Sequence, residues 1–228
     1  MRQREADLIA FVQEAIDRAA RHQSKLSEEV LRLPGMSAPK NRHLLNNLCS
    51  LPETVYLEIG TWKGSTLLSA LFGNRTTVRR AYAVENWAEF GGPREEFDKN
   101  VRTILDDTSH LAILQQDCFS VNPRAITEKV TVYFYDGDHS SESHYEAFAH
   151  YREVFDSPLV CLVDDWNWSR VREGTAAALE DLGFAVLHAW ELPARGNGDT
   201  DLWWNGLYVA VLRPWERAKP CPPQERPG

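Results

Sequence analysis

The sequence predicts an α/β protein whose mainly parallel sheet is doubly wound and whose N-terminal segment forms a helical cap. Two observations lead to this fold class. From residue 55 onward, short apolar runs alternate with longer segments in which apolar residues recur at helical spacing. Strands that alternate with helices pair in parallel and are covered by helices on both faces. Two of the apolar runs also end in acidic residues, at the edge of such a sheet where ligands bind.

The segment before residue 55 is expected to be helical. Apolar residues at helical spacing predict one helix over residues 4–33, which a Pro-Gly pair ends. Pro39 begins a shorter helix that runs through Leu48. We therefore predict a helical cap over residues 1–50, available as the floor of a substrate site or as a dimer interface.

Residues 51–213 are expected to form the main domain, and residues 214–228 a flexible tail rich in proline and charge. The apolar runs that we expect to form strands are 55–59, 81–84, 111–114, 130–135, 159–163, 184–187 and 207–212. The helices expected between them are 65–72, 94–105, 143–155 and 171–182. In the third of these helices, Ser143 and Glu146 suit a capping box. A polar, Gly-rich loop separates the last two strands, which are expected to form a hairpin-like pair.

Composition and charge limit the classes of function. The chain has 228 residues, and its formal net charge is -8 at pH 7 with a pI near 5.4. An acidic chain without a basic block is a poor candidate for a general nucleic-acid binder. No apolar run approaches membrane-spanning length, and the first residues lead into a charged helix instead of a signal peptide. The cysteines are scattered, which favours reduced thiols and a cytoplasmic protein. They are Cys49, Cys118, Cys161 and Cys221.

The first predicted strand-to-helix turn carries two glycines. It reads Glu58-Ile59-Gly60-Thr61-Trp62-Lys63-Gly64-Ser65. The glycines let the backbone turn sharply and let a ligand approach it, and the amides of the following helix face that ligand. Trp62 stands where the second glycine of the G-x-G-x-x-G dinucleotide motif would be, which argues against NAD. The turn instead resembles the E/D-x-G-x-x-x-G turn of class I S-adenosylmethionine (SAM) methyltransferases, with a purely structural tight turn as the alternative.

The resemblance to class I SAM methyltransferases covers residues 55–212 and implies a seven-stranded, Rossmann-like sheet. Glu85 ends the second strand, where the acid of this family accepts both ribose hydroxyls of the cofactor. Trp87 stands where the family often packs an apolar side chain on adenine, and Asp117 where it often places an acid against the adenine amino group. The cofactor-binding residues implied in this way are Glu58, Gly60, Thr61, Trp62, Gly64, Ser65, Glu85, Asn86, Trp87, Asp117, Cys118 and Asp136.

Acidic residues end two further strands. Asp136 follows the run 130–135, and Asp164 and Asp165 follow the run 159–163. Neighbouring parallel strands lie about 4.8 Å apart, so these carboxylates would repel one another strongly unless something neutralised them. Carboxylate oxygens without thiolates suit Mg²⁺, Mn²⁺ or Ca²⁺. The sequence therefore predicts a divalent-cation site.

The acidic strand ends resemble those of metal-dependent small-molecule O-methyltransferases, in particular the sugar O-methyltransferases of macrolide and aminocoumarin biosynthesis. The shared features are the Asp-Gly-Asp turn of residues 136–138 and the Val-Asp-Asp-aromatic strand end of residues 163–166. The resemblance implies that the metal ligands are Asp136, Asp164 and Asp165, with Mg²⁺ as the first choice of cation. In the alternative interpretation, Asp138 and Asp165 cap helices.

Catalysis in this scheme calls for a proton acceptor beside the metal. A metal-bound hydroxyl has a lowered pKa and is oriented toward the sulfonium methyl. The candidate catalytic residues are His139, Asp136 and Asp138, and His139 is favoured as the general base because imidazole titrates near neutral pH. Catechol-type relatives carry a lysine just after the first aspartate, and this chain has none there. His139 either takes over that role or caps the helix that follows.

The sequence thus predicts SAM-dependent, divalent-cation-assisted O-methylation of a small hydroxylated molecule. Tryptophans near the predicted site favour an aromatic or sugar-like acceptor. They are Trp62, Trp87, Trp166, Trp168, Trp203 and Trp204. Two alternatives stay open: a metal-dependent glycosyltransferase that uses Asp136-Gly137-Asp138 as a D-x-D motif, and a catalytically inert SAM-fold binding protein. We expect no membrane partner and no general nucleic-acid binding, and the N-terminal segment is compatible with a homodimer.

Overall fold

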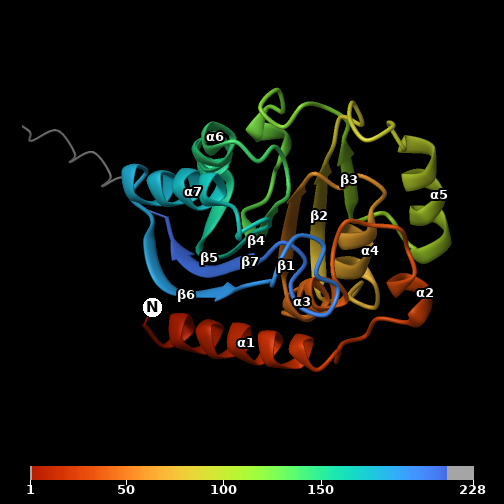
Figure 1. Cartoon of the computed structure of the whole chain (residues 1–228), viewed down its shortest axis with the longest axis horizontal. Coiled ribbons are helices and arrows are strands. Elements are labelled where there is room, and N and C mark those ends of the chain that lie inside the picture. Colours follow the sequence, from red (N-terminus) through yellow and green to blue (C-terminus); the bar gives the residue numbers. More distant parts are fainter. Residues whose placement is uncertain (1, 215–228) are drawn as a thin grey trace, which may run out of the picture.

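The structure, a computed structural model, describes residues 2–214, which fold around one seven-stranded sheet (Figure 1). The strands are β1 (Thr54–Ile59), β2 (Val78–Val84), β3 (Leu111–Leu114), β4 (Val130–Tyr135), β5 (Phe155–Val163), β6 (Ala185–Leu192) and β7 (Leu207–Arg213). Their order across the sheet is β3-β2-β1-β4-β5-β7-β6. β7 runs antiparallel to both β5 and β6, and the other neighbouring strands are parallel. The predicted fold class is confirmed, including the hairpin-like last pair.

Helices flank the sheet on both sides. They are α1 (Arg2–Ala20), α2 (Glu28–Leu31), α3 (Pro39–Leu48), α4 (Ser65–Leu71), α5 (Arg94–Ile104), α6 (Ser141–Tyr151) and α7 (Ser169–Asp181), with 3₁₀ turns η1 (Pro123–Ala125) and η2 (Arg152–Val154). None of the helices between residues 2 and 214 combines the length and the apolar character needed to cross a membrane. The tail predicted over residues 214–228, with Cys221, lies outside the described residues apart from Pro214.

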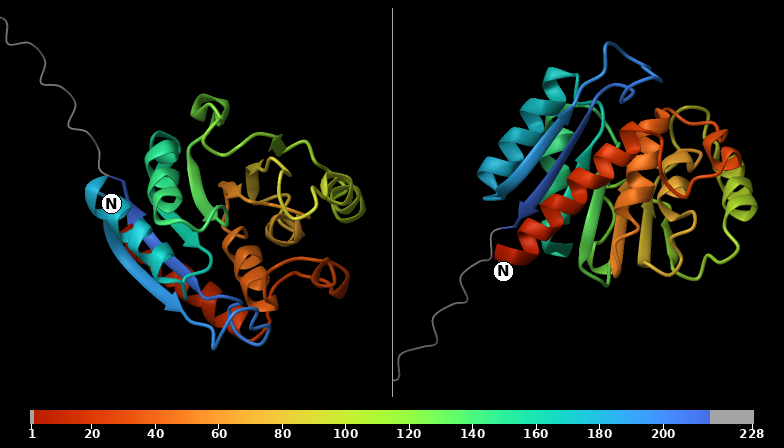
Figure 2. Two further views of the ribbon diagram at one scale, coloured as in Figure 1. Left: turned by 45° about the horizontal axis from the view of Figure 1, so that its top comes forward. Right: turned by 90° about the horizontal axis from the view of Figure 1, so that it is seen from below.

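Alternate residues of each strand point to opposite faces of the sheet and build two hydrophobic cores. On one face, Val132 and Phe134 of β4 belong to a cluster with residues of α1, α3, α4 and α5. On the other face, Tyr133 and Tyr135 cluster with residues of α6 and α7. Figure 2 shows these two helical layers, with α1 lying diagonally across the first face. The central strands are mostly apolar in sequence because both of their faces are buried.

The N-terminal segment forms part of the first helical layer. Leu44 and Leu48 of α3 share a core cluster with the strands and with the buried face of α1. Arg42 of the same helix is buried, and its guanidinium donates to the carbonyl oxygen of Leu31 at 2.9 Å. This contact ties the end of α2 to α3, and the loop between these two helices carries Met36 to the wall of a cavity described below.

The single helix predicted over residues 4–33 is wrong. α1 ends at Ala20 because the backbone of His22 is left-handed, with φ 58°, which a continuing right-handed helix does not allow. A new helix, α2, then begins after Ser27, whose side chain accepts a hydrogen bond from the N–H of Val30.

The helix predicted over residues 143–155 begins and ends earlier. α6 begins at Ser141, and the Ser140 hydroxyl caps it by accepting a hydrogen bond from the N–H of Ser143 at 3.1 Å. The capping box predicted at Ser143 is therefore wrong. The helix also stops before Phe155, because that residue already pairs with β4 as the first residue of β5.

The strand order places the carboxyl ends of β1 and β4 side by side near the centre of the sheet. The chain leaves β1 toward β2 and β3 on one side and returns to β4 on the other. The N–H of Asp136 donates to the carbonyl oxygen of Ile59 at 2.9 Å, and the N–H of Asp164 donates to that of Tyr135 at 3.1 Å. The predicted proximity of the acidic strand ends is confirmed. A ligand site is expected at this switch point of the strand order.

Candidate active site

A cavity of about 520 Å³ opens at the carboxyl ends of the strands. The sequence-predicted site residues that line it are Gly60, Trp62, Glu85, Asn86, Asp117, Cys118, Asp136, Asp138, His139, Asp164 and Asp165. The predicted site residues that do not line it are Glu58, Thr61, Gly64, Ser65 and Trp87. Most of the predicted cofactor residues and all of the predicted metal and catalytic residues therefore meet in one cavity.

Gly60 lets the chain turn sharply after β1 against the end of β4. Its φ is +85°, and a Cβ atom at this position would lie 1.9 Å from the carbonyl oxygen of Asp136. Glycine is therefore required both by the left-handed backbone and by the space. The N–H of Gly60 donates to the carbonyl oxygen of Val84 at 3.0 Å, which joins the turn to β2. The close approach brings the turn and Asp136 to the same cavity wall.

Thr61, Gly64 and Ser65 of the glycine turn do not line the cavity. Gly64 has φ +84° at the N-cap of α4, and its N–H donates to the carbonyl oxygen of Thr61 at 2.6 Å. The Thr61 hydroxyl is buried and has no hydrogen-bond partner within residues 2–214. Ser65 is buried at the first position of α4. The roles of these three residues in cofactor binding stay predictions.

Glu58 is enclosed in the protein and does not face the cavity. Its carboxylate accepts hydrogen bonds from the hydroxyls of Tyr56 and Thr66, the second at 2.8 Å. Burial raises the pKa of Glu58 to about 7, in opposition to these hydrogen bonds, which lower it. The side chain links β1 to the first turn of α4, and its contact with a cofactor stays a prediction.

Glu85 organises two turns that carry tryptophans. One carboxylate oxygen accepts from the N–H of Trp62 at 2.9 Å, and the other accepts from the N–H of Trp87 at 2.8 Å. Both tryptophans have left-handed backbones, and Trp87 Nε1 donates to the carbonyl oxygen of Trp62 at 2.8 Å. The Trp87 ring packs on Phe97, with 5.1 Å between ring centroids. Each Glu85 oxygen keeps acceptor capacity for a further donor, and Glu85 lines the cavity.

The segments after β2 and β3 give the cavity a polar wall. The Asp117 carboxylate accepts from the N–H of Phe119 at 3.0 Å, and the Asn86 side chain accepts from the N–H of Ala88 at 2.8 Å. These short turns fix the directions of both side chains. Burial raises the pKa of the adjacent Cys118 thiol to about 12, so this cysteine is a neutral thiol near pH 7.

Two carboxylates, Asp136 and Asp164, follow directly after β4 and β5. Burial raises the pKa of both well above the usual range, and repulsion from Asp165 raises each further. Asp164 is only 2% exposed, and its Oδ1 atom has no hydrogen-bond partner in the described part of the chain. A buried carboxylate oxygen without a donor favours a nearby cation or a proton.

His139 and Asp165 form a close pair in the cavity. His139 Nε2 lies 2.6 Å from one carboxylate oxygen of Asp165, and the side-chain amide of Asn205 donates to the other oxygen at 2.5 Å. The edge of the His139 ring also meets Trp168, with 4.8 Å between ring centroids. These contacts fix the orientation of the imidazole ring.

The helix-capping alternatives do not hold. Ser140 is the N-cap of α6, and Trp168 precedes α7 without a side-chain capping bond. Asp138 instead closes a turn, in which its carboxylate accepts from the hydroxyl of Ser140 at 2.5 Å and from the N–H at 2.9 Å. These bonds lower the pKa of Asp138 to about 2. Asp138 is thus an exposed anion at the cavity.

One set of side chains in the cavity has the spacing of a metal site. Asp136, His139 and Asp165 each offer a ligand atom, and these atoms lie within 4.8 Å of one another. Asp164 is outside this set, although it lines the same cavity with an unpartnered oxygen. Carboxylate oxygens suit Mg²⁺ or Mn²⁺, and the imidazole extends the choice toward metals such as Fe²⁺ or Zn²⁺. The donor set fits a divalent cation.

Several residues of the cavity wall, among them Asn205 and Met36, were not predicted from the sequence. Asn205, which holds Asp165, comes from the polar loop before β7, where the sequence carries no catalytic motif. Met36 and Phe90 are 40% and 63% exposed, unusual for large apolar side chains, and both line the cavity. The Gly-Gly pair after Phe90 indicates a loop but not the direction of that side chain.

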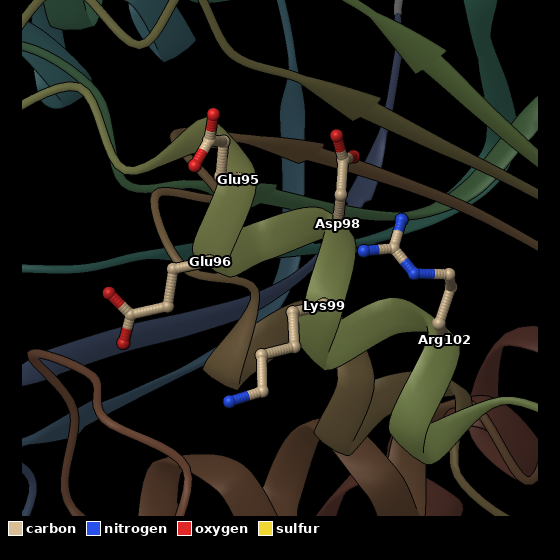
Figure 3. Close-up of a pocket in the computed structure, with 5 residues that line it drawn as sticks. All are labelled: Glu95, Glu96, Asp98, Lys99 and Arg102. Carbon is tan, nitrogen blue, oxygen red and sulfur yellow. The ribbon is translucent and has the colours of Figure 1, made fainter.

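A second depression, of about 490 Å³, lies on α5 (Figure 3). It is lined by Glu95, Glu96, Asp98, Lys99 and Arg102. All five belong to one helix, and Figure 3 shows their side chains pointing outward in different directions. No second element of the described chain lines this depression, so we interpret it as the solvated face of α5.

Comparisons with known proteins identify a matching family model for the central part of the chain. Residues 57–166 match a family model described as a methyltransferase domain. This segment begins in β1 and extends just beyond β5, so it includes the predicted cofactor and metal residues from Glu58 to Asp165. No curated protein matches the chain.

Several solved structures share the fold. The O-methyltransferase TomG from Streptomyces achromogenes, involved in tomaymycin synthesis and solved with SAM, is 18% identical, with coverage of 88% of this chain and 90% of that chain and a TM-score of 0.59. An O-methyltransferase from Bacillus cereus, solved with SAH, is 14% identical (90% and 91% coverage, TM-score 0.57). Precorrin-6y C5,15-methyltransferase from Geobacter metallireducens is 14% identical (75% and 86% coverage, TM-score 0.53).

Proposed function

We propose that this chain is a class I, SAM-dependent methyltransferase and that it methylates a hydroxyl group of a small molecule with the help of a divalent cation. One observation supports this proposal above the others. The carboxylates of Asp136, Asp164 and Asp165 share a single cavity with His139 and with the predicted ribose ligand Glu85. Such a cavity can hold a methyl donor next to a polarised acceptor hydroxyl.

The cavity wall near β1 and β2 suits the cofactor. SAM supplies a methyl group on a sulfonium ion. Glu85 would accept the ribose hydroxyls, because its two oxygens are held in place by backbone N–H groups and keep acceptor capacity. Gly60 would let the cofactor approach the backbone, and Asp117 would accept from the adenine amino group. A volume of about 520 Å³ lies in the range of small-molecule sites.

The cavity wall near β4 and β5 suits the cation and the acceptor. A divalent cation lowers the pKa of a hydroxyl that it coordinates. Asp136, Asp164 and Asp165 are the proposed ligands. The raised pKa values of Asp136 and Asp164, caused by burial and by repulsion from neighbouring carboxylates, favour this role, because a bound cation would relieve both costs. The unpartnered Oδ1 atom of Asp164 favours it as well.

His139 is the proposed general base. Its Nε2 nitrogen lies 2.6 Å from Asp165 and donates to that carboxylate, which leaves Nδ1 as the nitrogen that accepts a proton from the acceptor hydroxyl. Asp165 acts through His139 by holding its ring and tautomer, in the manner of the third member of a catalytic triad. Trp168 restricts the same ring from its edge.

The glycosyltransferase alternative has less support, because the matched family model and the three similar structures named above are described as methyltransferases. It also assigns no role to Gly60 or Glu85, although both line the cavity. The second alternative, a catalytically inert SAM-fold binding protein, differs from our proposal only in that it transfers no methyl group. Binding of SAM without methyl transfer to any acceptor would favour that alternative.

Methyl transfer from SAM labelled at its methyl carbon, with mass spectrometry of the products, tests the proposal. With a panel of small hydroxylated acceptors, we expect methyl ethers whose formation stops in EDTA and resumes when Mg²⁺ or Mn²⁺ is added. Transfer that EDTA does not change, or products methylated only on nitrogen or carbon, would contradict the proposed mechanism.

A matched pair of histidine variants tests the base. We expect His139→Asn to lower kcat by roughly 10²–10⁴-fold, the usual contribution of a general base. His188→Asn is the control, because His188 is exposed on β6 and does not line the cavity. Equal rates for the two variants would remove His139 from the mechanism.

A further inference from the structure

The cavity is lined by carboxylates and lacks fixed positive charge. The acidic lining residues are Glu85, Glu89, Asp117, Asp136, Asp138, Asp164 and Asp165. No lysine or arginine lines this cavity in the described chain, and His139 is its one basic side chain. An acceptor that approaches the reacting hydroxyl position therefore meets a strongly negative electrostatic potential.

Basic side chains close in sequence to residues of the cavity wall contact other groups. Lys63 pairs with Glu96 at 2.8 Å, and Arg94 pairs with Asp98 at 2.9 Å. Arg170 lies over the Trp168 ring, with its guanidinium carbon 5.0 Å from the ring centroid, and does not line the cavity. These contacts leave the carboxylates of the cavity without side-chain counter-charges, apart from His139 beside Asp165.

The unpartnered carboxylate oxygen of Asp164 also indicates that positive charge belongs in this cavity. Asp164 is 98% shielded from solvent, it lines the cavity, and its Oδ1 atom has no hydrogen-bond donor among residues 2–214. A sulfonium cofactor and one divalent cation would neutralise only part of the charge of the lining carboxylates. The exposed anion Asp138 adds negative charge on the side of the acceptor.

We propose that the acceptor carries an ammonium group close to its reacting hydroxyl, and that the cavity rejects acceptors that carry carboxylate or phosphate. This inference rests on the proposed function and names the class of its substrate. Anionic acceptors, nucleic acids included, need lysine or arginine contacts that the cavity wall does not offer. A cationic acceptor would satisfy the acidic wall without any rearrangement of the protein.

The same wall carries apolar surface for the remainder of the acceptor. Met36 and Phe90 reach the cavity from two separate loops and are exposed there, and Trp168 and Trp204 line it as well. An amine attached to an aromatic or other apolar framework matches both parts of the wall. This combination guides the choice of probes.

Three aromatic vicinal diols that differ in one substituent test the charge preference. They are dopamine, which is cationic, unsubstituted catechol, which is neutral, and 3,4-dihydroxybenzoate, which is anionic. Isothermal titration of each into the full chain saturated with SAH and Mg²⁺ gives the three dissociation constants. We expect dopamine to bind about tenfold more tightly than catechol and the benzoate to bind more weakly still, as one charge near several carboxylates implies.

Two amide variants locate the source of the preference. Asp138→Asn removes a charge but keeps the oxygen that accepts hydrogen bonds from Ser140. We expect the ratio of the dopamine affinity to the catechol affinity to fall about threefold or more. Asp181→Asn, an exposed position on α7 outside the cavity, should leave the ratio unchanged.

The possible results separate this inference from the proposed function. If SAH itself does not bind, the proposed function fails. If SAH binds but catechol or the benzoate equals or exceeds dopamine, or if none of the three diols binds, the charge preference is overturned and the methyltransferase proposal stands. A ratio that changes equally in both variants would overturn the assignment of the preference to the cavity.

Discussion

At Asp165, backbone strain and a functional contact occur in the same residue. Its backbone is left-handed, with φ 58°, and its carboxylate is held by His139 on one side and by Asn205 on the other. A conformation of this kind costs of order 1–3 kcal/mol and persists only where its surroundings determine it strongly. The sequence indicated Asp165 as a site residue from its place after an apolar run. It could not indicate Asn205, which lies 40 positions further along the chain.

Glu58 is expected to make the stability of the protein depend on pH. Burial raises its pKa in the folded protein to about 7, compared with 4.5 for the free side chain. Between these values the folded state binds the proton more tightly than the unfolded state does. The stabilising contribution is therefore complete below pH 4.5 and is lost as the pH rises through 7. The expected loss is about 3 kcal/mol, because one pKa unit corresponds to about 1.4 kcal/mol.

Urea unfolding at a series of pH values measures this effect. Relative to Glu58→Gln, which does not titrate, the wild-type protein should lose about 3 kcal/mol of unfolding free energy between pH 4 and pH 8. Glu180→Gln, at an exposed position on α7, is the control and should follow the wild type. Parallel pH curves for wild type and Glu58→Gln would show that Glu58 does not titrate in this range.

At the scale of elements, the turn from β1 to α4 depends on Gly60. A Cβ atom there would lie 1.9 Å from the backbone of Asp136, and neither strand end can move without breaking the sheet. We expect Gly60→Ala to lower the unfolding free energy by about 3–5 kcal/mol, the sum of overpacking and left-handed strain. Gly91→Ala is the matched control, because Gly91 has a similar φ of +83° but no atom within 4 Å of its added Cβ.

The control should lose only about 1–2 kcal/mol, the cost of the left-handed backbone alone. Chemical denaturation of both variants gives the comparison. Equal losses would mean that the contact between Gly60 and Asp136 contributes nothing beyond backbone strain.

The elements themselves differ in how far the sequence determines them. The central strands were predicted well, because burial on both faces makes runs such as 159–163 uniformly apolar. The break of the helix at His22 was not predicted, because it depends on one backbone angle. The start of α6 at Ser141 was not predicted either, because it depends on which of several serines caps the helix. The loop that carries Asn205 is placed by its contacts with Asp165, which no local pattern encodes.

At the scale of the whole molecule, the sheet order creates the site. The change of direction between β1 and β4 opens a crevice, and the strands on either side of it end in Glu85, Asp136 and Asp164. Two hydrophobic cores hold these strand ends in place from both faces. The alternation of strands and helices in the sequence is enough to predict this arrangement. The acceptor-side details, such as the pairing of His139 with Asp165, follow only from the folded chain.

The central claim is that the strand-end carboxylates bind a divalent cation beside the methyl donor. Titration of Mg²⁺ into the SAH-bound protein by isothermal calorimetry tests it most directly, on wild type, on Asp164→Asn and on the surface control Asp181→Asn. We predict saturable binding to the wild type and the control, and binding at least about tenfold weaker in Asp164→Asn, since one ligand charge is lost. Absence of Mg²⁺ and Mn²⁺ binding to the wild type, or equal binding to all three proteins, would contradict the claim.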